Sequence, residues 1–143
     1  MWKFHHICGK NISLENNCTT AKQVDPTRTD GICFTNTPLV NGKVYEIQVD
    51  ELGTKWDPPL MLGVTTHIPS FLTGIYWDVD LKESWILSGN SLYKNGERIS
   101  SYSFNLDTVQ VGDRLGLMKA SDSTLHFYLN GIDLGKAFSN LPE

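Results

Sequence analysis

The stretch that decides the fold reads Gly112-Asp-Arg-Leu-Gly-Leu-Met118 and resumes as Leu125-His-Phe-Tyr-Leu-Asn-Gly-Ile-Asp-Leu-Gly135. Apolar residues alternate with polar or small residues in both parts, which is the period of a β-strand with one buried face. Asn130-Gly131 stands between two alternating segments, and such a pair forms two-residue hairpin turns because both positions tolerate positive φ. We therefore predict short antiparallel strands, the last two joined by a tight hairpin.

Two further Asn-Gly pairs extend this pattern through the chain. Asn95-Gly96 separates Ser91–Lys94 from Glu97–Ile99, and Asn41-Gly42 leads into Val44–Val49, where every second residue is apolar. Pro, Gly and β-branched residues interrupt every window that could hold a long helix. The expected fold class is all-β, a two-layer antiparallel β-sandwich with almost no helix.

Other apolar segments are expected to complete the sheets. Leu60–Val64 is apolar on both faces and is predicted to lie centrally in a sheet, while Asn105–Val111 is expected to be a loop or a brief helical turn. We expect a strand at Phe4–Cys8 and further buried strands at Gly31–Thr35 and Ser84–Ser88.

Length and charge limit the classes of function. The 143 residues are expected to form a single domain, 1–143. The net charge is −4 and the basic residues are scattered, which disfavours nucleic acid and anionic membranes as partners. No apolar run of 18 residues and no signal-peptide core is present, so we expect a cytoplasmic protein without direct membrane binding.

Cysteine usage points to the same compartment. Cys8, Cys18 and Cys33 are odd in number and form no C-x-x-C pair, so reduced thiols are expected. The glycosylation sequons at Asn11 and Asn17 would matter only if the chain entered the secretory pathway.

The residues that could support catalysis or metal binding form no convincing site. A Ser-His-Asp triad could be assembled from His126 or His67, but there is no G-x-S-x-G nucleophile elbow, and His126 is interpreted as structural or outward-facing. His5 and His6 are adjacent and are expected on opposite faces of a strand, where they cannot share a metal. Asp78-Val-Asp80 lacks the glycine and later acidic ligand of a calcium loop. We expect no enzyme activity, no cofactor and no metal.

The strand period lapses between Val64 and Ser84, in a segment with three aromatic residues, Phe71, Tyr76 and Trp77. Connections of this length in compact domains are commonly functional, and aromatic anchors often dominate the energy of protein interfaces. The alternative is that these rings cover one end of the core.

Several glycine, aromatic and Asn-Gly motifs together resemble the Neuralized homology repeat, in family order from Phe4 to Pro142. The matching motifs are Phe4-His-x-x-x-Gly9-Lys-Asn11, Gly31-Ile-x-Phe34, Pro38-Leu-x-x-Gly42, Val49-Asp-Glu-Leu52, Trp56, Leu60-x-x-Gly63-Val-Thr65, Trp85-x-x-Ser-Gly89, Asn95-Gly96, Gly112-Asp-Arg-x-Gly116 and Leu125-His-Phe-x-x-Asn-Gly-x-Asp-x-Gly135. The chain looks most like one repeat of a multi-repeat member of the family. The resemblance implies a β-sandwich of the SPRY-like, concanavalin type.

The resemblance also implies a noncatalytic protein-protein interaction module. Such a module would serve an adaptor or scaffold linked to ubiquitin-ligase pathways, with Notch signalling and the centrosome as its contexts. The expected partner is a protein or peptide, and a carbohydrate-binding sandwich remains the alternative. Loops carry specificity in such folds, so binding residues are predicted there and are expected to converge at one end or face. They are Trp56, Asp57, Pro58, Phe71, Tyr76, Trp77, Asp78, Asn90 and Tyr93.

Overall fold

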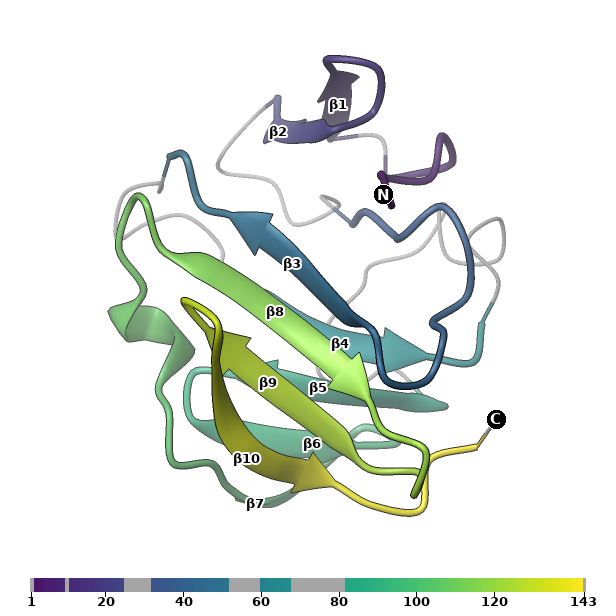
Figure 1. Ribbon diagram of the computed structural model, residues 1–143, viewed down its shortest axis with the longest axis vertical. Helices are drawn as coiled ribbons and strands as arrows, with labels where there is room; N and C mark the ends of the chain where they lie inside the picture. Colours follow the sequence, from purple (N-terminus) through teal and green to yellow (C-terminus); the bar gives the residue numbers. More distant parts are fainter. Residues whose placement is uncertain (1, 10, 25–31, 52–59, 68–81, 143) are drawn as a thin grey trace.

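The protein is a sandwich of two four-stranded antiparallel sheets, seen in a computed structural model that describes residues 2–9, 11–24, 32–51, 60–67 and 82–142 (Figure 1). The front sheet, nearest the viewer in Figure 1, has the order β10-β9-β8-β3, and the back sheet has the order β4-β5-β6-β7. A separate hairpin, β1-β2, packs above them. The predicted antiparallel β-sandwich is confirmed.

The strand bounds follow the alternating segments of the sequence. The front sheet consists of β3 (Val44–Gln48), β8 (Arg114–Lys119), β9 (Leu125–Leu129) and β10 (Ile132–Phe138). The back sheet consists of β4 (Met61–Thr65), β5 (Ser84–Ser88), β6 (Ser91–Lys94) and β7 (Glu97–Ser101). The outer hairpin consists of β1 (Ile12–Glu15) and β2 (Thr20–Gln23). In the described part of the chain the only helix is a 3₁₀ turn, η1 (Leu106–Thr108), inside the segment expected to be a loop or brief helical turn.

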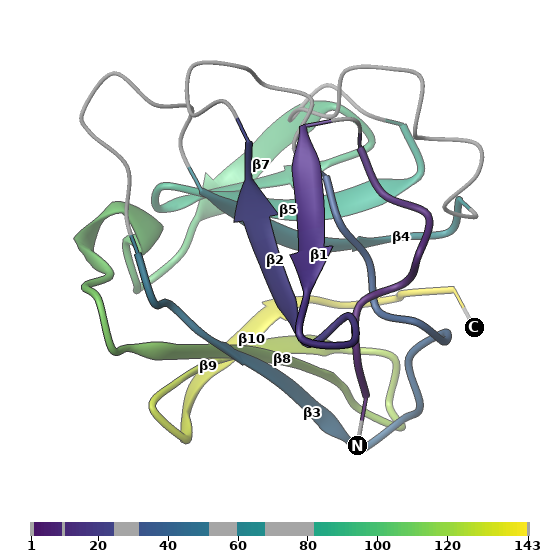
Figure 2. The same cartoon turned by 90° about the horizontal axis from the view of Figure 1, so that it is seen from above.

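The core fills the space between the two sheets, which face each other when seen from above (Figure 2). Leu115, Leu117 and Phe127 point inward from the front sheet, and Trp85 and Leu87 from the back sheet, all into one buried cluster. Tight packing of this kind supplies most of the favourable free energy of folding, at roughly 25 cal/mol for each Å² of apolar surface removed from water. The predicted inward faces of these strands are confirmed.

Two of the Asn-Gly pairs form the expected hairpins. Asn130 and Gly131 have φ values of 52° and 82°, and Asn95 and Gly96 have 52° and 84°. Each asparagine also accepts a backbone hydrogen bond at 2.8 Å, Asn130 from Arg114 and Asn95 from Glu83. The asparagines therefore satisfy backbone donors beside the neighbouring strands, as well as tolerating the left-handed conformation.

A tyrosine joins the two sheets beyond β7. The hydroxyl of Tyr102 donates to the carbonyl of Gly135 in β10 at 2.7 Å, and the Tyr102 ring meets Phe127 edge-on at 5.6 Å. Gly135 has a φ of 104°, within a stretch where the β9-β10 register shifts. The irregularity presents a carbonyl oxygen to the opposite sheet.

Three strand predictions need correction. Leu60–Val64 was expected centrally, but β4 is the edge of the back sheet among the described strands. Apolar residues on both faces of the segment suggested a central strand. They indicate that both faces are covered, but they do not show whether both edges of the strand are hydrogen-bonded. Phe4 and Thr35 form an isolated bridge, and no described residue of Phe4–Cys8 or Gly31–Thr35 lies in a strand. Gly31 lies outside the described residues. Among the described residues, none forms a helix long and apolar enough to cross a membrane.

The β1-β2 hairpin has no counterpart among the sequence-based predictions. Its turn holds three consecutive residues with positive φ, namely Asn16, Asn17 and Cys18, at 54°, 57° and 63°. No Asn-Gly pair marks this turn, and β2 reads Thr-Ala-Lys-Gln, without the apolar alternation that identifies a strand. The alternation of β1, Ile-Ser-Leu-Glu, was by itself too short a signal to predict the hairpin.

Candidate functional site

Two of the nine predicted binding residues lie in the described part of the chain. Asn90 is exposed in the turn between β5 and β6, where its carbonyl accepts a hydrogen bond from the Tyr102 N–H at 2.7 Å. Tyr93 is half-buried in β6, opposite Ile86 of β5. The other seven lie outside the described residues, and their role stays a prediction: Trp56, Asp57, Pro58, Phe71, Tyr76, Trp77 and Asp78.

The ends of β4 show where the two predicted loops attach. Leu60 precedes β4 at the end where Met61 pairs with Ser88, which is also the end that carries the Asn90 turn. His67 follows β4 at the other end, where Thr65 pairs with Ser84. The bases of the two loops thus lie at opposite ends of one strand, so convergence of the loops at one end gains no support from their attachment points.

A polar cluster fixes the base of the segment that contains Phe71, Tyr76 and Trp77. The Nε2 atom of His67 lies 3.1 Å from the carbonyl oxygen of Lys82, across the gap between the two flanks. The Lys82 ammonium donates to the Asn95 carbonyl at 3.0 Å. Thr65 donates to the carbonyl of Glu83 at 3.0 Å. These bonds tie the two flanks to each other, and the Lys82 flank to the β6-β7 hairpin.

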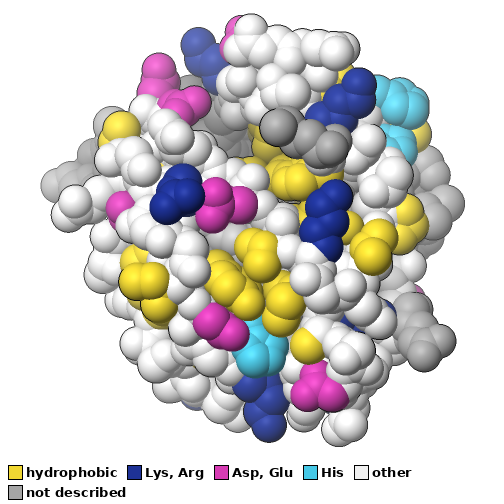
Figure 3. All heavy atoms as spheres, viewed as in Figure 1, with side chains coloured by type: hydrophobic (Ala, Val, Ile, Leu, Met, Phe, Trp, Pro, Cys, Tyr) yellow, Lys and Arg dark blue, Asp and Glu magenta, His cyan; other side chains and the backbone are white. Residues whose placement is uncertain are grey.

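An apolar patch occupies the outer face of the front sheet, where hydrophobic side chains gather over the middle strands (Figure 3). It is built from Val44 of β3, Met118 of β8 and Tyr128 of β9, which occupy outward positions in adjacent strands. Gly116 lies beneath it: a Cβ there would stand 3.1 Å from Val44 Cγ1 and 3.4 Å from Tyr128 Cβ. The missing side chain lets these neighbours close over the strand into a continuous surface. We call Val44, Met118 and Tyr128 the front patch.

Charged groups border the front patch. Arg114 Nη1 lies 3.5 Å from Glu46 Oε1 on one side. On the other side the Tyr128 hydroxyl lies 3.4 Å from Asp133 Oδ2 and 3.7 Å from the sulfur of Met118. An apolar centre with a polar rim is the usual anatomy of a protein interface.

Thr124, His126 and Asp133 are connected in the order of a catalytic triad, but the hydroxyl group is not activated as a nucleophile. His126 Nδ1 lies 3.1 Å from Asp133 Oδ1, and His126 Nε2 lies 3.1 Å from Thr124 Oγ1. The Thr124 hydroxyl, however, donates its proton to Asp122 at 2.6 Å, and Thr124 is only 7% exposed. A hydroxyl whose proton is committed to a carboxylate is not activated by the histidine. His126 is half-buried in β9 and lies between Thr124 and Asp133, and its interpretation as structural or outward-facing stays a prediction.

The carboxylates of Asp133 and Asp122 are stabilised as anions. The N–H of Gly135 donates to Asp133 and lowers the pKa of its carboxyl, with a further contribution from His126. The Thr124 hydroxyl lowers the pKa of Asp122 in the same way. Hydrogen bonds to the charged form explain both directions.

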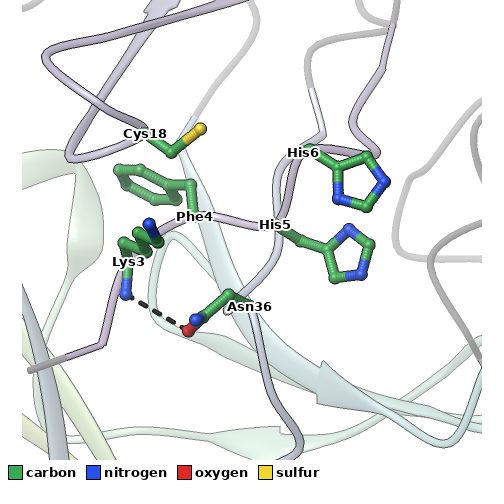
Figure 4. Close-up of a pocket in the computed structure, with 6 residues that line it drawn as sticks. All are labelled: Lys3, Phe4, His5, His6, Cys18 and Asn36. Carbon is green, nitrogen blue, oxygen red and sulfur yellow. Dashed lines mark hydrogen bonds between the residues drawn. The ribbon is translucent and has the colours of Figure 1, made fainter.

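A hollow of about 360 Å³ lies at the N-terminal segment, lined by Lys3, Phe4, His5, His6, Cys18 and Asn36 (Figure 4). Backbone bonds of 2.8 Å hold its walls: Phe4 N–H to the Cys18 carbonyl, His5 N–H to Phe34, and Asn36 N–H to Lys3. No sequence pattern predicted this hollow. It joins segments up to 33 residues apart, and nothing in their local pattern shows that they meet.

The arrangement of His5 and His6 corrects the sequence-based expectation. Their rings stack at 4.6 Å with an interplanar angle of 20°, as Figure 4 shows, rather than lying on opposite faces of a strand. The chain bends at His6 and is not in a strand there, so strand alternation does not apply. Within the described residues, no group of three or more His, Cys, Asp or Glu side chains could hold a metal ion.

The three cysteines are free thiols in the structure. Burial raises the pKa of Cys33 to about 12 and also raises that of Cys8, with the neighbouring Cys18 adding to the latter effect. A thiol with a raised pKa is a poor nucleophile at neutral pH, because little of it is thiolate. Cys8 and Cys33 are therefore not suited to nucleophilic catalysis.

Comparison with known proteins agrees with this architecture. The family model described as Neuralized matches residues 4–143. Neuralized-like protein 2 of Mus musculus is 32% identical over 73 residues, which cover 51% of this chain and 25% of that protein, and the Homo sapiens protein gives the same values. The match therefore spans a quarter of those relatives. The crystal structure of the Drosophila melanogaster Neuralized NHR1 domain superposes with a TM-score of 0.71 at 14% identity, covering 99% of this chain and 83% of that one. The chain belongs to the Neuralized family.

Proposed function

We propose that this domain is a noncatalytic protein-interaction module that binds a peptide or a partner domain. The observation that carries the proposal is the match of residues 4–143 to the Neuralized family model. Membership of this family suggests a protein-recognition module. The finer context is part of the same proposal: an adaptor or scaffold linked to ubiquitin-ligase pathways, in the cytoplasm or at the centrosome. Fold alone does not specify function, so the proposal also needs surfaces that are suited to binding a partner.

The front patch supports binding on physical grounds. Val44 is 37% exposed, and its neighbours Met118 and Tyr128 are half-buried in a rigid sheet rather than in a loop. Side chains fixed in a sheet lose little conformational entropy when a partner covers them. Tyr and Met are enriched at interfaces, where they offer apolar area together with adaptable contacts.

The predicted loop residues form the second surface of the proposal. The two predicted loops that flank β4 contain four aromatic residues, Trp56, Phe71, Tyr76 and Trp77. Of these, Trp56, Tyr76 and Trp77 are the proposed anchors. Removing one aromatic anchor from a protein interface typically costs about 2 kcal/mol of affinity, which is about thirtyfold in Kd. Loss of binding without loss of stability would assign an anchor role.

Affinity capture with matched variants tests the proposal. The immobilised domain is exposed to cell lysate, captured proteins are identified by mass spectrometry, and each is then purified and its Kd measured. The front patch is changed with Met118→Glu, and the loops with Trp77→Ala. The control is Val111→Asp, which removes an apolar side chain that is 61% exposed and lies outside the patch. Thermal melts verify that each variant folds.

Three outcomes decide between the surfaces. A purified partner whose affinity falls at least tenfold with Met118→Glu or Trp77→Ala, but not with Val111→Asp, supports the proposal and identifies the surface. Equal binding by all variants would show that neither surface is used. If no protein binds the unaltered domain directly, while a glycan array gives a specific signal, the carbohydrate-binding alternative replaces the proposal.

A further inference from the structure

The N-terminal segment is paired with a second segment of the chain at two places. Phe4 and Thr35 form an antiparallel bridge at one place. At the other, the Gly9 N–H donates to the Ile32 carbonyl at 2.8 Å. Between these contacts the first segment uses two more residues than the second. The two segments therefore change register between the contacts.

A bend at His6 takes up the two extra residues. The Ile7 N–H closes this bend by donating to the Nδ1 atom of His5 at 2.9 Å. Beyond the bend, the hydrogen bond made by Gly9 sets the register of the two segments.

Cys8 and Cys33 lie opposite each other in this second register. In antiparallel chains, a hydrogen bond from the N–H of residue i+1 to the carbonyl of residue j−1 makes i and j a non-hydrogen-bonded pair. The bond from Gly9 to Ile32 has this relation to the two cysteines. The Cα atoms of such a pair are about 4.5 Å apart. A disulfide needs a Cα separation of roughly 4.4 to 6.8 Å, so the backbone spacing suits a bond between Cys8 and Cys33.

The side chains of the two cysteines are also near each other. Burial raises the pKa of the Cys33 thiol to about 12, and charge repulsion from Cys8 adds to the increase. The Cys8 thiol donates to the carbonyl of Ile12 at a long 3.9 Å. A thiol is a weak donor, so little is lost when this contact is exchanged for a bond to Cys33.

Cys18 is the third thiol of this region, and its backbone pairs with a different residue. Its carbonyl accepts a hydrogen bond from the Phe4 N–H at 2.8 Å. Burial raises the pKa of Cys8 and repulsion from Cys18 adds to it, so these two thiols are neighbours as well. Among the described backbone hydrogen bonds, however, none places Cys18 opposite Cys8. Cys33 is therefore the better placed partner for Cys8.

We infer that Cys8 and Cys33 are a site of oxidative modification, and that they form a disulfide when the folded protein meets hydrogen peroxide. In the first step the Cys8 sulfur attacks a peroxide oxygen and becomes a sulfenic acid, while the displaced hydroxide takes the thiol proton and leaves as water. In the second step the Cys33 sulfur bonds to the Cys8 sulfur, the S–O bond breaks, and the hydroxyl group leaves as water with the Cys33 proton. Two thiols are oxidised, and one peroxide is reduced to two waters.

The burial of the thiols determines the order and the speed of these steps. The Cys33 thiol is the more buried of the two, so Cys8 is the one that meets the oxidant. The thiolate is the reactive form, and the raised pKa values make the first step slow, so it needs peroxide in excess. The second step joins two groups that the fold already holds side by side, which compensates for the low reactivity of Cys33.

The disulfide would close a loop that contains the β1-β2 hairpin. A cross-link across a loop of this length restricts the unfolded chain, and we expect it to raise Tm by about 5 to 10 °C. Oxidation would thus fasten the N-terminal segment to the segment that carries Cys33. This inference is independent of the proposed function, because it involves neither the front patch nor the two predicted loops.

Oxidation followed by peptide mapping tests the inference on the 143-residue chain. The reduced protein, kept dilute, is treated with excess hydrogen peroxide, which catalase then removes. The remaining thiols are alkylated in denaturant without a reductant. Trypsin places the three cysteines in different peptides, residues 4–10, 11–22 and 29–43. The mass of a cross-linked pair of peptides therefore identifies the two thiols that are joined.

We expect the peptide with Cys8 to be joined to the peptide with Cys33, in at least about tenfold excess over either other pairing. The same oxidation in urea is the control for selectivity, because an unfolded chain should give comparable amounts of all three pairings. Cys18→Ala is the matched variant that should still form the cross-link and show the rise in Tm. Cys8→Ala should show neither. Melts before oxidation verify that each variant folds, and dithiothreitol should reverse the rise in Tm.

Two kinds of result would overturn the inference. The first is a different chemical outcome in the folded protein, either a disulfide to Cys18 as the main product or oxidised Cys8 without a cross-link. The second is a cross-link between Cys8 and Cys33 that leaves Tm unchanged or lowers it, because the native backbone would then not fit the bond. The expected pair with a reversible rise in Tm supports the inference.

Discussion

The bond between Tyr102 and Gly135 makes the sharpest test of how the two sheets are held together. Tyr102→Phe removes one hydroxyl and keeps the ring, so the edge-on contact with Phe127 at 5.6 Å is preserved. What is lost is the 2.7 Å hydrogen bond from the sheet-bridging hydroxyl to the Gly135 carbonyl. The substitution therefore isolates a single cross-sheet interaction.

The expected loss of stability follows from burial at both ends of the bond. Tyr102 is 9% exposed, and the carbonyl that loses its donor belongs to the half-buried Gly135. A net intramolecular hydrogen bond contributes about 1 kcal/mol, and an unsatisfied carbonyl adds a desolvation cost. We expect a decrease of about 1 to 2 kcal/mol in the free energy of unfolding. For a chain of 143 residues this is about 3 to 6 °C in Tm.

Thermal and urea unfolding, each followed by circular dichroism, would measure this loss. Tyr128→Phe is the matched control, because it removes the same atom from a half-buried ring whose bonds are longer, at 3.4 and 3.7 Å. We expect its stability to change by less than about 0.5 kcal/mol. Equal stability of the two variants would refute the assignment of Tyr102 as a link between the sheets.

Four further predictions follow from the same structure. Burial raises the pKa of Tyr102 to about 12, above its ordinary value of 10.0. The folded protein therefore favours the neutral phenol, and the free energy of unfolding keeps its full value below pH 10. Roughly 2 kcal/mol of it should be lost between pH 10 and 12, and urea titrations should show a smaller loss in Tyr102→Phe. Gly63→Ala should cost about 3 kcal/mol in a urea titration, because its Cβ would lie 2.2 Å from the backbone oxygen of Trp85. Gly131→Val should cost at least about 1 kcal/mol, since φ is 82° there, and an unchanged melt would contradict the turn assignment. Cys33, with its pKa raised to about 12, should resist iodoacetamide at pH 8 in the folded protein and react after unfolding, as mass spectrometry would show.

The predictable part of the fold is the part that local sequence determines. Asn95-Gly96 and Asn130-Gly131 specify both turn conformation and strand register, and alternation then assigns each side chain to a face. The β1-β2 hairpin has no Asn-Gly turn, and apolar alternation is present in β1 but not in β2. Its turn relies on Asn16, Asn17 and Cys18 in the left-handed region, and only the two asparagines favour that conformation. Its position is set by contacts with distant segments, which a single sequence does not display.

The surface was less predictable than the fold, for a related reason. The outward positions of β3, β8 and β9 could be read from alternation, but not that Val44, Met118 and Tyr128 would be neighbours across three strands. Strand order is a nonlocal property, and it creates the front patch. The hollow beside Lys3 depends equally on long-range pairing. Residues such as Trp77 were selected because they lie where the strand alternation lapses. That signal does not show which residues are neighbours in space.

Gly116 connects the requirements of the fold with those of the surface. A Cβ at this position would stand 3.2 Å from the backbone oxygen of Tyr45 and 3.1 Å from Val44 Cγ1, so β3 and the front patch both depend on its absence. The contacts are looser than those at Gly63, and Gly116→Ala should therefore fold with a smaller loss of stability. The added methyl group would nevertheless push apart the side chains of Val44 and Tyr128 that close over the glycine. If the front patch binds the partner, Gly116→Ala lowers partner affinity by more than its effect on stability explains. If the loops alone bind, affinity stays the same while the melting temperature falls.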